Sequence, residues 1–174
     1  LRRWEKQDFK PLPDDIFQER LYAIQWISQE TLSAGRQETW FAAPTDADLQ
    51  REQHVEQLVT ENLSRWQEQG LVPDMVIEPG DKTDEPIRTR GWTHWHHMFS
   101  PRQLLVAALV HEQIQRMSAD VQPALCLSLA KMLDWSSKLC RYGTGAAREA
   151  ITQTFYNQAY NTNYFYGVRS FVTG

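Results

Sequence analysis

The clearest apolar repeat of the chain lies between residues 44 and 69. Large apolar side chains recur there at steps of three and four residues, at Val55, Leu58, Val59, Leu63 and Trp66. This spacing places them on one face of a helix. Thr45 and Asp48 have the spacing of a capping box in its acidic variant, and Gly70 suits the position just after a helix. The pattern predicts a helix over 44–69.

A second helix is predicted to begin just after Ser100. Serine is a good cap, Pro101 suits the first helical position, and Gln103 can reach back to the cap amide. The helix is predicted over 101–117. It is apolar almost all round from Leu104 to Val110, which predicts a central buried helix.

The remaining helices are predicted from weaker patterns. A second core helix is expected over 123–139, with four side chains facing inward: Leu125, Leu129, Met132 and Leu133. Gly143 and Gly145 then break the chain. Thr144 is placed to cap a shorter helix over 146–159.

The N-terminal part favours strands. Tyr22, Ile24 and Trp26 alternate as in a strand, although Leu21, Ile24 and Ile27 could equally line a helix. A short aromatic run follows at 38–42, after turn-like residues. The interpretation is a β-hairpin within 18–43. Residues 71–99, with three Pro and two Gly, predict an ordered but irregular connection.

Together these elements predict a mainly α chain with a small β-hairpin (α+β), in which 101–117 and 123–139 are the core helices. The 174 residues suit a single domain or a fragment of a larger chain, and 41% hydrophobic with 11% aromatic residues excludes wholesale disorder. No apolar run reaches the ~18 residues of a membrane span. Two cysteines, Cys126 and Cys140, cannot alone form a four-ligand zinc site, and so few fit a reducing cytoplasm.

Candidate chemistry is concentrated between Asp81 and Gln103. These 23 residues hold two Trp, three His and three Arg, a mixture that suits recognition better than core packing. The net charge of −4 is not that of a general nucleic-acid binder, so any phosphate contact must be local. Six residues are the candidates for gripping phosphates or stacking on bases: Arg88, Arg90, Trp92, Trp95, His96 and Arg102.

A structural interpretation of the same segment is also open, and the nearby acidic residues favour it. In it, Trp92 and Trp95 anchor the loop on the core, and the arginines pair with the nearby acids Asp81, Asp84 and Glu85.

Other constellations are weaker. His94, His96 and His97 could bind a divalent metal, but adjacent histidines point different ways in most backbones. The run 136–138 lies at a predicted helix end and needs no catalytic explanation. Aromatic tail residues could face bases or a core: Tyr160, Tyr164, Phe165, Tyr166 and Phe171.

Four segments follow one another in an order that resembles a known family. They read APTDADL, TRGWTHWHHMFSPRQLL, SSKLCRY and TFYNQAYNTNYFYGVRS. Over residues 14–170 the chain resembles the middle portion of large adenine-specific DNA methylases, which often carry a Zn-ribbon and occur in genome-defence neighbourhoods. The best-matched part is W-x-x-x-F-x-P-R-Q-L, from Trp95 to Leu104.

The resemblance implies a parent enzyme that transfers a methyl group from S-adenosylmethionine to the exocyclic amine of adenine. Such enzymes need a Gly-rich cofactor loop after a strand and an Asp/Asn-Pro-Pro-Tyr/Phe motif, and this chain has no Pro-Pro pair. The family's zinc-ribbon cysteines are also absent. No catalytic, cofactor-binding or metal residue is therefore assigned here, and S-adenosylmethionine is expected only in the parent.

The implied role is a non-catalytic insert that contacts DNA or helps to recognise the target. In a restriction-modification or phage-defence enzyme of this family, it would lie between the cofactor-binding motif and the catalytic motif. An enzyme that extrudes its target base needs a region that grips the duplex. Its expected partners are DNA and the rest of the parent chain, and no membrane. The rival hypothesis is a structural or protein-interaction module. A hydrolase or metal enzyme has only the histidines to support it.

Overall fold

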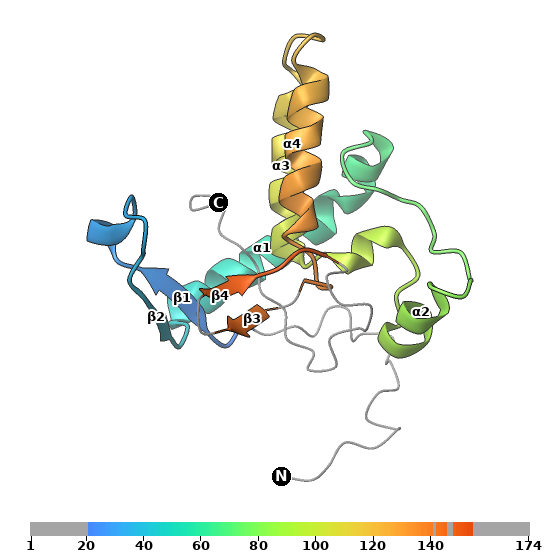
Figure 1. The fold of residues 1–174 in the computed structure, drawn as a ribbon. Coiled ribbons are helices and arrows are strands. Elements are labelled where there is room, and N and C mark those ends of the chain that lie inside the picture. The colour runs from blue at the N-terminus through green and yellow to red at the C-terminus, as the bar shows by residue number, and fades with distance from the viewer. Residues whose placement is uncertain (1–20, 141, 146–147, 155–174) are drawn as a thin grey trace.

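The computed structural model describes residues 21–140, 142–145 and 148–154, which are mainly α-helical with small antiparallel hairpins (Figure 1). The predicted fold class is thereby confirmed. The elements in chain order are β1 (Ile24–Ile27), β2 (Thr39–Ala42), α1 (Asp46–Glu68), α2 (Asp84–Arg90), α3 (Pro101–Gln115), α4 (Gln122–Asp134), β3 (Tyr142–Gly145) and β4 (Arg148–Ile151). In this part of the chain, no helix is long and apolar enough to cross a membrane.

The predicted N-terminal hairpin is present within the described residues. Strands β1 and β2 pair antiparallel, with Trp26 opposite Trp40. Opposite residues share one face of a two-stranded sheet, so the two indoles lie on the same face, and both are largely exposed. Alternation, rather than the helical alternative, is the correct interpretation of this segment.

Both predicted capping boxes are formed. The amide of Thr45 donates to Asp48 Oδ2 at 2.9 Å, and the amide of Asp48 donates back to Thr45 Oγ1 at 3.3 Å. The Thr45 hydroxyl, which donates to Asp48 Oδ2 at 2.7 Å, and then the Thr45 amide lower the pKa of the Asp48 carboxyl. Gly70 has φ 70°, the left-handed conformation expected just after a helix.

The start of α3 is closed in the same way but is buried. The amide of Ser100 donates to Gln103 Oε1 at 2.8 Å, and the amide of Gln103 donates to Ser100 Oγ at 3.5 Å. Pro101 occupies the first turn. Because both partners are within three residues, the start of this helix could be predicted from sequence alone.

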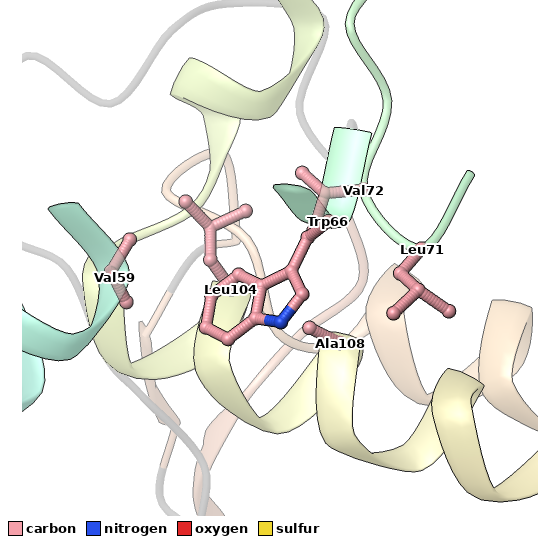
Figure 2. Packing of buried hydrophobic residues seen from close by; sticks show 6 residues of the cluster. All are labelled: Val59, Trp66, Leu71, Val72, Leu104 and Ala108. Atoms are coloured by element: carbon pink, nitrogen blue, oxygen red, sulfur yellow. The ribbon is translucent and has the colours of Figure 1, made fainter. Parts of the chain in front are cut away.

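The main core lies where α1 crosses α3. Trp66, near the end of α1, is 5% exposed and lies against Leu104 and Ala108 of α3 (Figure 2). The chain that follows α1 turns back over the indole, since the amides of Leu71 and Val72 both donate to the Trp66 carbonyl. Helix α4 then packs on α3 as its antiparallel neighbour (Figure 1).

Two helix predictions need correction. Helix α4 ends at Asp134 instead of residue 139, because the carbonyl of Asp134 accepts hydrogen bonds from the amide and hydroxyl of Thr154. Helix α3 is not buried all round, since Leu109 is 47% exposed. The irregular connection 71–99 also contains a helix, α2, which the prediction missed.

The helix predicted over 146–159 is wrong where the structure describes it. Strands β3 and β4 form an antiparallel hairpin there, and Thr144 pairs with Glu149 instead of capping a helix. The Gly143-Thr144-Gly145 triplet lies in a strand, where its two glycines oppose helix formation. Residues 155–159 lie outside the described part.

The α1–α3 core gives a direct stability test. Trp66→Ala removes a buried ring and leaves a cavity, so we expect the free energy of unfolding to fall by about 3–5 kcal/mol. Trp40→Ala is the matched control because its ring is 51% exposed, and we expect a change below about 1 kcal/mol. Urea unfolding followed by circular dichroism measures both. Equal losses in the two variants would contradict this assignment of the core.

Candidate functional site

The predicted recognition segment, Asp81 to Gln103, is folded against residues 75–77. The amide of Ile77 donates to the Thr93 carbonyl at 2.9 Å, and that of Trp95 donates to the Met75 carbonyl at 3.1 Å. Gly91 ends α2 with φ 66°, a conformation that favours glycine. Backbone hydrogen bonds therefore fix this segment in the fold.

The two tryptophans anchor this segment. Trp92 is 3% exposed and forms a second apolar cluster with Ile77 and Met98. Trp95 is half-buried and packs against the same cluster. The structural interpretation of the rings is the one observed. The Trp92 ring is too deeply buried to serve as a platform on which a base could stack.

The three arginines are placed differently from one another. Arg88 is exposed on α2, whereas Arg90 is buried. Arg102 forms an ion pair with Glu52 of α1, which joins α3 to α1. The expected acidic partners were local, so the sequence prediction missed Glu52, which lies 50 positions earlier in the chain. Of the three guanidiniums, only Arg88 is both exposed and outside the ion pairs that the structure shows.

The histidines form a compact cluster. The ring centroids of His94, His96 and His97 lie 4.4–5.5 Å apart. Gln67 of α1 approaches His96, with 3.2 Å between Gln67 Nε2 and His96 Nδ1. Burial, and then the charge of His94, lower the pKa of His96. The cluster thus ties the recognition segment to α1.

His97 is held neutral by its surroundings. Its Nδ1 accepts from the amides of Thr93 at 3.1 Å and His94 at 3.4 Å, so the ring uses its lone pair on the backbone. Burial first, and then the charges of His96, His94 and Lys138, lower the pKa of His97 to about 4. A neutral ring that stabilises a turn explains the position without catalysis.

Among the described residues, no three His, Cys, Asp or Glu side chains are grouped so that they could hold an ion. His97 also uses the lone pair of its Nδ1 on two backbone amides, and the other nitrogen of a neutral imidazole carries the proton.

A buried polar network beside this segment was missed by the sequence analysis. Ser137 Oγ lies 2.7 Å from Thr154 Oγ1, and the amide of Lys138 donates to the Met98 carbonyl at 2.8 Å. Lys138 itself is 2% exposed. A lysine at a helix end normally reaches solvent, so nothing local in the sequence indicated this burial. The network fastens the chain after α4 to the recognition segment.

The second missed feature is an exposed apolar surface on α3 and α4. Four large apolar side chains on or between these helices are exposed: Leu109, Met117, Val121 and Leu127. A groove of about 370 Å³ runs along one side of the pair. The local signal for this surface was the all-round apolar pattern, which had been interpreted as burial.

Comparison of the chain with protein-family models, curated proteins and solved structures gives no match. The methylase resemblance therefore stays a prediction.

The low pKa of His97 predicts acid sensitivity. In the unfolded chain the imidazole takes up its proton near pH 6.5, whereas the folded ring resists protonation until about pH 4. Between these values the unfolded state binds more protons, so stability is complete above pH 6.5 and is lost as the pH falls. A proton that binds only to the unfolded state lowers the free energy of unfolding by about 1.4 kcal/mol per pH unit. Because His97 is partly exposed, we expect roughly half of this loss.

Urea midpoints measured across this pH window test the assignment. His97→Asn keeps a side-chain acceptor for the Thr93 and His94 amides but cannot be protonated, so we expect a flatter pH dependence. His54→Asn is the control, because His54 is exposed on α1, and it should retain the wild-type slope. A His97→Asn slope identical to wild type would rule out His97 as the source.

Proposed function

We propose that this chain is a non-catalytic docking module that binds protein surfaces through the α3–α4 pair. In the S-adenosylmethionine-dependent DNA adenine methyltransferase that the sequence resembles, it would be a helical insert that holds other parts of the enzyme together. One contrast carries the proposal. The residues expected to grip DNA are largely buried or ion-paired, whereas an apolar surface is exposed on α3 and α4.

The composition of the two helices supports docking. Between Gln103 and Val110, and again between Val121 and Ala130, there is no charged residue. A helix that is apolar on most of its surface is normally covered. In α4, however, Leu129 is the one large side chain that is fully buried. Contiguous exposed apolar surface of this kind marks interaction sites.

The proposal assigns no cofactor or catalytic group to the described residues. S-adenosylmethionine would be bound by the rest of the parent enzyme. The few cysteines support a cytoplasmic location, since Cys126 and Cys140 are both free.

Direct DNA contact is the second candidate function, and one observation favours it. Arg88 is exposed at the end of α2, and the side chain of Arg102 is 44% exposed in spite of its ion pair. Two such cations could contact a phosphate backbone. The net charge of −4 opposes this function, because it repels DNA at longer range.

Salt-titrated binding to duplex and single-stranded DNA separates the two functions. At about 50 mM salt we expect no saturable binding up to about 100 µM protein, the weak end of non-specific affinity. Arg88→Ala should therefore behave like Arg36→Ala, a control at an exposed arginine in the β1–β2 hairpin. Micromolar binding whose salt slope falls by about 1 in Arg88→Ala alone would instead establish DNA contact.

Docking itself is measured by amide hydrogen exchange. We expect α3 and α4 to exchange more slowly within the longer protein than in this chain at low concentration, because docking excludes water from their exposed side. Helix α1, whose contacts lie within the chain, is the internal reference. Unchanged exchange in α3 and α4 would contradict docking.

A further inference from the structure

One groove on the α3–α4 pair has no charged group in its walls. It is lined by Leu109, Val110, Gln113, Ile114, Met117 and Leu125. Leu109 and Met117 are each 47% exposed, so they stand at its rim. Projecting side chains and a groove that could receive such side chains therefore occur within one patch.

The groove faces away from the core of the chain. Leu104 and Ala108 point toward α1, where they join the Trp66 cluster. Leu109 and Gln113 follow these two residues by five positions, which is about 140° around a helix of 3.6 residues per turn. His111 Nδ1 lies 3.3 Å from the Leu71 carbonyl, so the loop after α1 covers the side of α3 that faces the core. The described core does not fill the groove.

We infer that a second copy of this chain occupies the groove, forming a two-fold dimer in which two α3–α4 pairs pack into four helices. The inference rests on the docking function proposed above and names the occupant. In a two-fold interface the same patch meets itself, so a patch must contain both the projecting side chains and the hollow that receives them. The Leu109–Met117 rim and the groove between them meet this requirement.

The charges on the two helices favour a second copy over a partner of strong opposite charge. Glu112 pairs with Arg116 at 2.8 Å, Lys131 pairs with Asp134 at 3.4 Å, and Arg102 pairs with Glu52. Every charged side chain of α3 and α4 is thus paired within one copy. No charge is left over to select a partner of opposite sign, and two neutral surfaces bury no unpaired charge when they meet.

The size of the face sets the expected affinity. Helices of 15 and 13 residues are each about 20 Å long and about 10 Å wide. Side by side they offer roughly 400 Å² per copy, half of the ~800 Å² per partner in a standard interface. We therefore expect a reversible dimer with a Kd on the order of 10–100 µM.

Sedimentation equilibrium at about 1–200 µM, spanning the expected Kd, tests the inference. The mass should rise from 20.3 kDa toward twice that value as concentration increases. Leu109→Glu places a charge in the interface and should weaken dimerisation at least about tenfold. Leu32→Glu is the matched control: Leu32 is 41% exposed in the β1–β2 hairpin, outside α3 and α4, so its dimer should persist. A wild-type monomer at every concentration, or equal effects of the two variants, would overturn the inference.

Cross-linking provides a readout that does not depend on the Leu109 variant folding well. Gln113→Cys in a Cys126→Ser background puts a thiol in the groove, and a short bis-maleimide should join two copies. Wild type carries its exposed thiol at Cys126, in a different groove, and should cross-link much less. The reverse result would overturn the proposed interface.

Different experimental results would reject the docking function and the second copy. A monomeric chain whose α3 and α4 are nevertheless protected in the longer protein would reject the second copy but leave docking intact. Unchanged exchange in the longer protein, together with a concentration-dependent dimer of this chain, would reject docking within the parent and support self-association alone.

Discussion

The burial of Trp66 is the interaction on which the arrangement of the helices depends. An indole of this size removes about 200 Å² from water, worth roughly 5 kcal/mol, and its position near the end of α1 fixes where α3 must cross. The Trp66 carbonyl accepts from the amides of Leu71 and Val72, which bends the following chain over the ring. One residue thus contributes to the helix crossing through its ring, and to the path of the loop that leads to the recognition segment through its main-chain carbonyl.

Fixing α3 on one side leaves its other side without a partner inside the described fold. Helix α4 covers a strip of α3 but brings apolar side chains of its own, so adding it extends the apolar surface. The polar network around Ser137 and Thr154 then holds the lower end of α4 in place. The pair is consequently held by hydrogen bonds at its base and exposes apolar side chains along its length. A preorganised surface loses less conformational entropy on association, which suits the docking proposed for it.

The features predicted correctly from sequence are those whose partners are close in the chain. The starts of α1 and α3 follow from hydrogen bonds spanning three residues, and the β1–β2 hairpin follows from alternation. Some failures involve distant partners and others do not. Helix α4 stops early because Thr154 reaches the Asp134 carbonyl. The β3–β4 hairpin, whose paired residues Thr144 and Glu149 are close in the chain, replaces a predicted helix through local structure that the pattern did not reveal. In the candidate site, the aromatic anchoring was foreseen as an alternative, but the Glu52 partner of Arg102 and the burial of Lys138 depend on the tertiary fold.

Long-range contacts also determine what the arginines of the recognition segment are free to bind. Gripping a phosphate backbone requires cations that are free to exchange counterions for phosphates. Arg90 is buried and Arg102 is engaged with Glu52, so using either against DNA would mean breaking the contacts that hold the segment to α1 and the core. The α3–α4 surface has no such contacts to break, because its charges are paired at its edges and its centre is neutral. Covering it removes apolar area from water at little electrostatic cost. Crowded Arg, His and Trp residues can therefore serve to build a scaffold, while the helices with the simplest composition expose the apolar surface for which docking is proposed.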